Sequence, residues 1–234
     1  MSSRHVTAVS ITRLTPNFRA EARDELVCEE EWGIIVNGQG IAVLNCLPAH
    51  LEQLAAGHLF TLGRLRRADE IIKMDIDEVA KKIVVELNPS DSEDSPPVND
   101  GITLAARDIH RLQGEFNERC QLFRRTGAVH SVALADRDGL IIFFDDVARH
   151  NALDKVIGEM VLRGLSASNK ALIFSGRIAL DMLRKVCAAD VKLLIAPGAP
   201  TAAGVMMARE KGITLLGFVR ADNINIYTHD HRVL

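Results

Sequence analysis

The stretch Leu140-Ile141-Ile142-Phe143-Phe144-Asp145-Asp146-Val147-Ala148-Arg149-His150-Asn151-Ala152-Leu153-Asp154-Lys155 passes from an apolar run into a segment dense in charged, imidazole and amide side chains. The apolar run is typical of a buried strand, and Asn151 and Asp154 fall in the first turn of the helix expected after it. Such groups at the carboxyl end of a strand suit a ligand crevice of an open α/β sheet. A solvated helix start has a similar composition, because helix N-termini favour Asp and Asn, so the spacing leaves both interpretations open.

Short apolar runs alternate with helical patterns on both sides of this stretch. We expect strands over 131–135, 140–144, 171–174, 192–196, 214–219 and 224–227, and helices over 151–163, 181–189 and 202–211. Apolar residues that recur every three or four positions predict a further amphipathic helix over 102–123, with Cys120 on or near its apolar side. Short strands separated by helices indicate an α/β fold with a mixed or parallel sheet covered by helices on both faces.

The first 88 residues predict a smaller α+β unit. Residues 6–13 alternate as an edge strand does, and Asn37-Gly38 between two apolar runs predicts a β-hairpin. A helix over 51–62 that ends at Gly63 and strands over 71–77 and 82–87 complete the unit. The acidic, proline-rich stretch that follows predicts a linker, so the expected parts are 1–88, a linker or loop over 89–101, and 102–234.

Composition bounds the functional class. The 234 residues are 47% hydrophobic and only 4% aromatic, which indicates an aliphatic core. A formal charge of −3 gives no general attraction to nucleic acid or membranes. The N-terminus has no apolar signal core, and no apolar run approaches the roughly 18 to 20 residues that span a bilayer. We therefore expect a soluble, cytoplasmic protein.

The four cysteines, Cys28, Cys46, Cys120 and Cys187, lie far apart and form no compact metal-ligand array. Disulfides are not expected in a reducing cytosol, and each thiol is expected to pack as a small apolar side chain. His58 lies on the apolar stripe of its helix and is expected to be a half-buried, hydrogen-bonded histidine rather than a ligand.

Three further loops follow expected strands: Ser175-Gly176-Arg177, the segment 196–201 with Thr201 as a possible N-cap, and the segment 217–223. Each has a purely structural alternative, as a helix start or a turn. Loops that follow successive parallel strands gather at one edge of a sheet, where ligands bind, and the Asp145–Lys155 stretch belongs with them. Arginines and helix amides suit phosphates, and a carboxylate such as Asp222 accepts from the N–H edge of guanine. We therefore expect an anionic ligand with a planar ring.

These same blocks resemble the FdhD/NarQ family of formate dehydrogenase accessory sulfurtransferases over nearly the whole chain. The resemblance rests on ordered motifs: Val36-Asn37-Gly38 with Pro48, Leu54-Ala55-Ala56-Gly57, Thr126-Gly127-Ala128-Val129-His130-Ser131, Asp146 to Lys155, Ser175-Gly176-Arg177, Ala199-Pro200-Thr201, Gly217-Phe218-Val219-Arg220 and Tyr227-Thr228. It implies a cytidine-deaminase-like α/β domain over 102–234. It further implies a cytosolic homodimer that carries sulfur from a cysteine desulfurase to the molybdenum bis(molybdopterin guanine dinucleotide) cofactor, which is bound as cargo and is destined for formate dehydrogenase.

The resemblance also suggests the residues that bind this cofactor. The family segment used against the guanine cofactor corresponds to Phe218, Val219, Arg220, Ala221, Asp222 and Asn223. The family signature block contributes Arg149, His150, Asn151, Asp154 and Lys155, and the two other loops contribute Ser175, Arg177 and Thr201. The sequence does not fix their individual roles.

One departure from the family pattern concerns sulfur chemistry. Many members carry a Cys-x-x-Cys after the N-terminal unit, whereas residues 88–102 of this chain contain no cysteine. Cys120 is the nearest downstream thiol but lies outside the motif, so no catalytic residue is assigned. A non-catalytic, cofactor-binding chaperone is therefore the alternative function, and a structural subunit whose loops only form a dimer interface is a third. The chain also lacks the Pro-Cys-x-x-Cys and His-x-Glu of zinc deaminases, so we expect no zinc.

Overall fold

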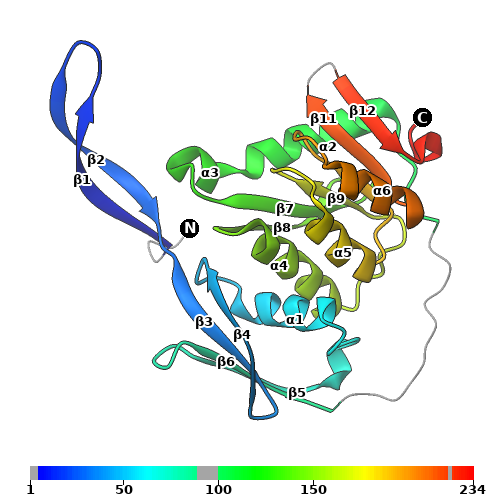
Figure 1. The fold of residues 1–234 in the computed structure, drawn as a ribbon, viewed down its shortest axis with the longest axis horizontal. Coiled ribbons are helices and arrows are strands. Elements are labelled where there is room, and N and C mark those ends of the chain that lie inside the picture. The colour runs from blue at the N-terminus through cyan, green and yellow to red at the C-terminus, as the bar shows by residue number, and fades with distance from the viewer. Residues whose placement is uncertain (1–4, 89–99, 221–222) are drawn as a thin grey trace.

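Six strands form the larger sheet of the protein, in the order β12-β11-β10-β9-β7-β8 (Figure 1). The computed structural model describes residues 5–88, 100–220 and 223–234. The six strands are β7 (His130–Ala135), β8 (Leu140–Asp146), β9 (Ala171–Phe174), β10 (Leu193–Ile195), β11 (Thr214–Arg220) and β12 (Asn223–Thr228). Strand β7 is antiparallel to both β8 and β9, while β9, β10 and β11 are parallel to one another, and β12 is antiparallel to β11. The expected mixed sheet is thus confirmed, with β8 to β11 pointing in one direction.

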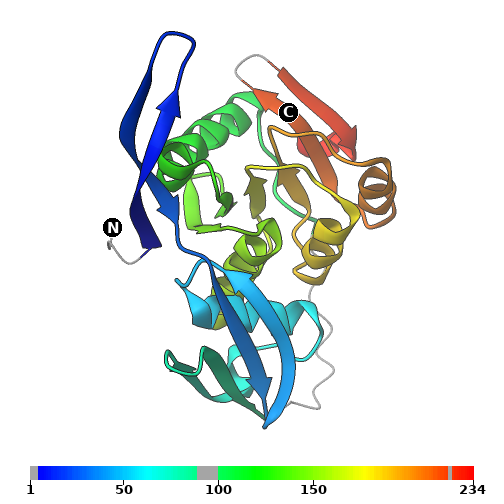
Figure 2. The same ribbon diagram turned by 60° about the vertical axis from the view of Figure 1, so that its left-hand side comes forward.

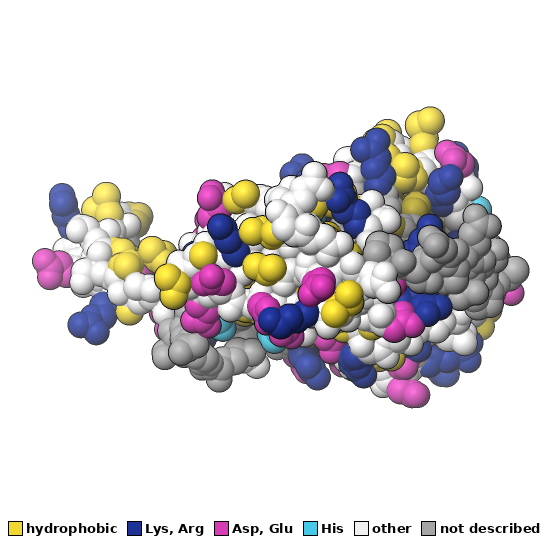
Figure 3. Space-filling view, turned by 90° about the horizontal axis from the view of Figure 1, so that it is seen from below, with side chains coloured by type: hydrophobic (Ala, Val, Ile, Leu, Met, Phe, Trp, Pro, Cys, Tyr) yellow, Lys and Arg dark blue, Asp and Glu magenta, His cyan; other side chains and the backbone are white. Residues whose placement is uncertain are grey.

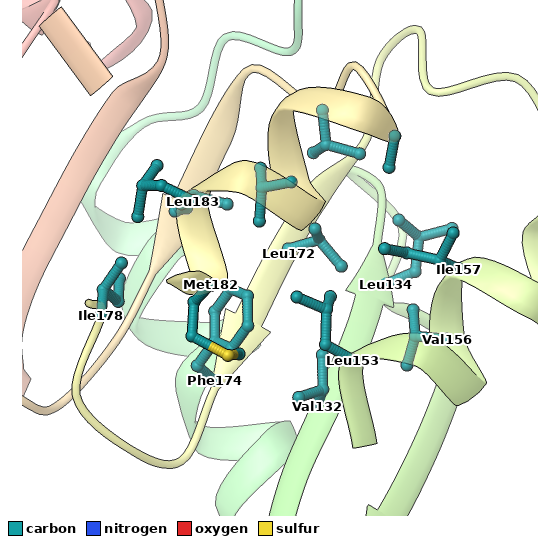
Figure 4. Close-up of a cluster of buried hydrophobic side chains, with 14 of the residues drawn as sticks. Val132, Leu134, Leu153, Val156, Ile157, Leu172, Phe174, Ile178, Met182 and Leu183 are labelled. Carbon is teal, nitrogen blue, oxygen red and sulfur yellow. The ribbon is translucent and has the colours of Figure 1, made fainter. Parts of the chain in front are cut away.

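Helices cover both faces of this sheet because its strands are apolar on both sides. Val132 and Leu134 of β7 pack with Leu153 of α4 (Arg149–Leu162) and Met182 of α5 (Leu180–Ala188) in one buried cluster (Figure 4). Ala208 of α6 (Ala202–Glu210) belongs to the same cluster and is fully buried. The alternate residues of β7, Ala133 and Ala135, pack on the opposite face against α2 (Ala106–Arg119). A strand buried on both faces has no polar side, which explains the near-continuous apolar runs in the sequence.

The smaller sheet has the order β4-β3-β6-β5, and one helix covers it. It comprises β3 (Glu30–Val36), β4 (Gln39–Cys46), β5 (Ile71–Asp77) and β6 (Lys82–Leu87), while α1 (Leu51–Thr61) packs on it and a short 3-10 helix, η2 (Ala68–Glu70), precedes β5. The predicted hairpin turn is confirmed, because Asn37 and Gly38 connect β3 to β4 and both have positive φ. Trp32, Leu54 and Ile83 lie at the centre of this second core.

The two units meet where α1 crosses α4 (Figures 1 and 2). A Cβ atom on Gly57 would overlap with the backbone carbonyl of Asp154, and one on Gly158 would overlap with that of Gln53. Glycine at both positions therefore allows the two helix backbones to touch.

An arm formed by β1 (Val6–Leu14) and β2 (Arg19–Val27) projects from the body (Figures 1 and 2). The two strands form a separate two-stranded antiparallel sheet. The sequence predicts the first of these strands but not its pairing with residues 19–27. Beside the base of the arm, Arg125 of α3 (Gln121–Thr126) forms an ion pair with Glu25.

The predicted helix over 102–123 is wrong at its start and at Cys120. Ile102 and Leu104 precede α2 in an extended segment, in which Leu104 bridges to Val233 beyond the 3-10 helix η3 (Asp230–Arg232). The helix then breaks at Cys120, where α2 ends and α3 begins. Cys120 is nevertheless buried in the apolar core, as expected. The linker predicted over 89–101 lies, for residues 89–99, outside the described residues, and the boundaries of the three parts stay a prediction.

Candidate functional site

The four predicted loops meet at one edge of the larger sheet, because β8, β9, β10 and β11 all end there. Backbone hydrogen bonds connect the loops directly: the N–H of Val219 donates to the carbonyl of Ala196, and the N–H of Phe218 donates to that of Gly198. The Ser131 N–H donates to the Ser175 hydroxyl over 2.9 Å, which joins the start of β7 to the same edge. The expected clustering of these loops is confirmed.

Glycines allow the loops to pack backbone on backbone. A Cβ on Gly198 would lie 2.9 Å from the carbonyl oxygen of Gly176, and one on Gly217 would lie 3.1 Å from that of Gly198. The first distance is shorter than real Cβ contacts allow, and the second is tighter than most of them. The edge is therefore built from closely stacked main chain, a surface that a ligand can approach closely.

Phe218 occupies a strained backbone conformation at this edge. Its φ is 50°, an uncommon value for a bulky residue, and it lies in the bulge of β11 opposite β12. The bulge leaves Val219 buried in the core, while Phe218 is half-buried and Arg220 is exposed with its guanidinium 5.9 Å from the Phe218 ring. Asn223 donates to the Phe218 carbonyl over 3.2 Å. Ala221 and Asp222, also predicted as cofactor contacts, lie outside the described residues.

Thr201 and Arg177 stand on the neighbouring loops. The Thr201 hydroxyl accepts from the Gly204 N–H over 3.1 Å, so the predicted N-cap of α6 is confirmed. Arg177 is exposed. Arg177 therefore presents its positive charge to solvent, whereas Thr201 has a clear structural role.

Arg149 and His150, at the start of α4, share Asp181 of α5 as a partner. Arg149 Nη2 lies 3.1 Å and His150 Nε2 lies 3.0 Å from the Asp181 carboxylate. Burial lowers the pKa of His150, although the Asp181 charge opposes this shift. His130, at the start of β7, also has a pKa lowered by burial and lies against Gly176. Asp181 and His130 are absent from the predicted cofactor contacts. An Asp in the first turn of a helix is common for structural reasons, so the sequence position of Asp181 does not indicate a binding site.

The other polar residues of the Asp145–Lys155 stretch point inward. Lys155 and Asp146 form an ion pair of 2.6 Å whose side chains are both 0% exposed. Lys155 also donates to the Leu47 carbonyl over 3.0 Å, and Asp146 accepts from the Leu47 N–H over 3.2 Å. Asn151 donates to Asp146 and to the Asn45 carbonyl. These contacts fasten the segment after β4 of the smaller unit to the larger domain.

Asp154 is likewise fully buried, with an exposed fraction of 0%. His58 Nδ1 lies 3.2 Å from its carboxylate and Lys185 forms an ion pair with it. The expectation of a half-buried, partnered His58 is thus confirmed. The predicted contacts of Asn151, Asp154 and Lys155 with a cofactor stay a prediction, and the geometry gives all three an internal role.

The four cysteines are free thiols. Burial raises the pKa of Cys46 to about 12 and also raises the pKa values of Cys120 and Cys187. Cys28 lies half-buried beyond the end of β2, 3.4 Å from the Thr7 hydroxyl. Because the thiolate is the nucleophile, burial makes Cys46, Cys120 and Cys187 poor sulfur acceptors at neutral pH.

Among the described residues, no group of three or more His, Cys, Asp and Glu side chains is arranged to hold a metal ion. Nor does any helix in the described ranges combine the length and the apolar character needed to cross a membrane.

The sequence model of the FdhD/NarQ family matches residues 27–96 and 85–234 of this chain. The chain belongs to the FdhD/NarQ family. The resemblance seen in its motifs is therefore confirmed.

Several relatives of this family member carry the name "Sulfur carrier protein FdhD". One from Bacillus pumilus is 35% identical, and the match covers 90% of this chain and 90% of the relative. One from Geobacillus kaustophilus is 32% identical and covers 92% of each chain. One from Bacillus subtilis is 31% identical and covers 97% of this chain and 98% of the relative.

The fold is also similar to that of a solved structure, described as a "putative formate dehydrogenase accessory protein" from Desulfotalea psychrophila. The TM-score is 0.88 at 27% identity, and the match covers 98% of this chain and 100% of the other. The α/β fold class predicted from the sequence is thus confirmed both by the architecture and by this similarity.

Proposed function

We propose that this protein is a cytoplasmic accessory protein of formate dehydrogenase that binds the molybdenum bis(molybdopterin guanine dinucleotide) cofactor as cargo. The cofactor contacts the carboxyl edge of the larger sheet. The protein acts as a homodimer and, as a sulfur carrier, receives sulfur from a cysteine desulfurase and passes it to the cargo. The names of its relatives and of the similar solved structure support the accessory role.

The observation that carries the binding proposal is the meeting of the four loops at one edge. Arg149, Arg177 and Arg220 belong to three of these loops, and guanidinium groups bind diphosphates by paired hydrogen bonds. The Phe218 ring, beside Arg220, offers a surface on which a planar base can stack. The edge therefore combines cationic and aromatic groups suited to a guanine dinucleotide.

Calorimetry with GDP, which carries the guanine and diphosphate groups of the cargo, tests this proposal. Arg220→Ala should weaken GDP binding about tenfold or more, since one hydrogen bond to a charged group contributes about 1.5–3 kcal/mol. Arg64→Ala, at an exposed arginine of the smaller unit, serves as the matched control and should bind GDP as the unaltered protein does. Equal affinities of the two variants would exclude Arg220 from the site, and no GDP binding by the unaltered protein would refute the guanine-binding proposal.

A second candidate function is cofactor binding without sulfur transfer. The lack of cysteine in residues 88–102 and the raised pKa values of Cys46, Cys120 and Cys187 favour it. A carrier thiolate must attack the outer sulfur of the desulfurase persulfide and release the desulfurase cysteine as a thiolate. A buried neutral thiol performs this exchange poorly.

Mass spectrometry separates the two candidates. The purified protein is incubated with a cysteine desulfurase and cysteine, and each of its four cysteines is examined for an added sulfur atom. A persulfide on any of them supports the sulfur-carrier function. Unmodified cysteines, together with retained GDP binding, would leave the binding chaperone as the function.

A further inference from the structure

The arm exposes apolar side chains on a ribbon that has little contact with the rest of the protein. Leu14 is 76% exposed, Phe18 55% and Leu26 48%. Figure 3 shows the arm extending from one end of the molecule, with hydrophobic, basic and acidic side chains all on its surface. An isolated two-stranded ribbon is only marginally stable in water, and the outer edge of each strand presents backbone groups that another strand can pair with.

The register of the arm shows which backbone groups of β2 face outward. The Cys28 N–H donates to the His5 carbonyl, and the Thr15 N–H donates to that of Phe18. Both pairs continue the register in which Ala22 pairs with Ile11. Since hydrogen-bonded and non-hydrogen-bonded pairs alternate, the even-numbered residues of β2 bond to β1. The N–H and C=O groups of residues 19, 21, 23 and 25 therefore point away from β1.

The residues of β2 whose backbone groups point away from β1 carry alternating charges: Arg19, Glu21, Arg23 and Glu25. This pattern is complementary to itself when reversed about Ala22. If a second β2 runs antiparallel beside the first, with the two copies of Ala22 opposite each other, then Glu21 meets Arg23 and Arg19 meets Glu25, twice each. Opposite charges on directly paired positions stabilise a sheet, whereas like charges destabilise it.

We propose that the homodimer of the proposed function, on which this inference rests, forms when two copies of this chain join their arms through β2 into one four-stranded antiparallel sheet about a two-fold axis at Ala22. The hydrogen-bonded pairs of the new ladder are the four oppositely charged pairs. Such an isologous contact closes on itself and yields a dimer rather than a fibre. Glu25 then lies between Arg125 of its own chain and Arg19 of the second copy.

The same register gives the exposed tip of the arm a partner. Phe18 of the second copy lies opposite Leu26, on the face of the sheet that also carries Ala22. Ion pairing with Arg125 places α3 on the other face, that of Glu25. Phe18 and Leu26, both exposed in the single chain, thus cover each other in the dimer.

The outer edge of β1 is a poorer choice for this pairing. The residues of β1 whose backbone groups point away from β2 are Val6, Ala8, Ser10, Thr12 and Leu14, and none of them is charged. No charge pattern would therefore fix a register there, and the charged edge of β2 remains the one that specifies a partner.

Charge reversal tests the proposal on the full chain. Sedimentation velocity should show a dimer for the unaltered protein. Glu21→Arg should weaken the dimer at least tenfold, because it places arginine opposite Arg23, and the exchanged pair Glu21→Arg with Arg23→Glu should restore it. Glu78→Arg changes the net charge equally at an exposed turn between β5 and β6, and should leave the dimer intact. A monomeric unaltered protein, or a dimer unaffected by Glu21→Arg, would overturn the proposal.

Cross-linking tests the register itself. Directly opposed residues of a non-hydrogen-bonded pair lie within reach of a disulfide, so Ala22→Cys should yield a disulfide-linked dimer under mild oxidation. Thr12→Cys, at an exposed position on the outer edge of β1, should not link copies faster than the native cysteines do. Equal linking by the two variants would overturn pairing at Ala22, and far-UV circular dichroism verifies that each variant is folded.

Discussion

Lys155 and Asp146 form an ion pair removed from solvent, and backbone groups of the smaller unit complete its hydrogen bonds. The Lys155 ammonium reaches the Leu47 carbonyl as well as Asp146, and the Asp146 carboxylate also accepts from Leu47, Ala148 and Asn151. A buried charge is tolerated only when it is paired and hydrogen-bonded in this way. At this residue scale, the pair secures the segment after β4 of the smaller unit against the larger domain.

Removal of one member of this pair should be costly. Lys155→Met leaves the Asp146 carboxylate buried without its cation, and we expect a loss of about 3–5 kcal/mol in the free energy of unfolding. Urea unfolding followed by circular dichroism measures the change. Lys73→Met, which removes the cation of the exposed pair with Asp75, is the control and should cost at most about 1 kcal/mol. Equal losses in the two variants would mean that the buried pair contributes no more to the free energy of unfolding than the exposed pair does.

His50 should make stability depend on pH. Burial, assisted by the positive charge of Lys155, lowers the pKa of His50 below its usual value of 6.5. The unfolded chain therefore binds the proton more readily than the folded one, and the free energy of unfolding should fall as the pH drops below about 6.5. Asp145 acts with the opposite sign, because burial raises its pKa and its contribution falls as the pH rises.

His50→Asn isolates the histidine contribution. The φ of His50 is 56°, a left-handed conformation that Asn also tolerates. Urea unfolding at a series of pH values between 5 and 7.5 should show a shallower decrease for the variant than for the unaltered protein. An identical slope would show that His50 makes no contribution to the pH dependence.

At the scale of elements, the crossing of α1 and α4 depends on two glycines that face backbone carbonyls across the contact. The helices belong to different units, so their separation determines how closely the units pack. Residues with a Cβ at these two positions would force the backbones apart.

Gly57→Ala or Gly158→Ala should therefore destabilise the protein by at least the roughly 1–3 kcal/mol typical of overpacked cores. Gly114→Ala is the matched control, because a Cβ added at Gly114 on α2 meets nothing within 4 Å apart from its chain neighbours and the nearby backbone of its own helix. The control should gain up to about 1 kcal/mol, since alanine favours helix more than glycine does. Thermal or urea unfolding of the three variants measures these changes, and a stabilising Gly57→Ala would contradict the close crossing.

At the scale of the whole molecule, the units should unfold together. Trp32 is the only tryptophan, lies in β3 and is 2% exposed, so its fluorescence reports on the smaller unit. Far-UV circular dichroism is dominated by helices of the larger domain. Because the helix crossing and the buried Lys155–Asp146 pair connect the units, the two signals should give the same urea midpoint. In Gly158→Ala the midpoints should separate, and separate midpoints already in the unaltered protein would contradict this coupling.

Much of this architecture could be predicted from the sequence. Strands β7 to β11 are short apolar runs between helical patterns, and the Asn37-Gly38 turn and the Gly63 helix end have strong local signals. The start of α2 could not be predicted, because Ile102 and Leu104 fit a helical period. In the structure, Leu104 instead forms a β-bridge with Val233, which is distant in the chain. The pairing of the arm strands was also missed, since β2 is almost entirely polar or exposed.

The sequence by itself determined the family and the order of the strands and helices from β3 onward, apart from the break between α2 and α3, because motifs, turns and apolar periodicity are local properties. It also predicted that the loops after β8 to β11 meet at one edge. Only the tertiary structure decided which polar groups of Asp145–Lys155 face that edge. Arg149 and His150 reach Asp181 there, while Asp146, Asn151 and Lys155 turn inward to the segment around Leu47. The reason is that the docked smaller unit, over 100 residues away along the chain, buries one side of α4.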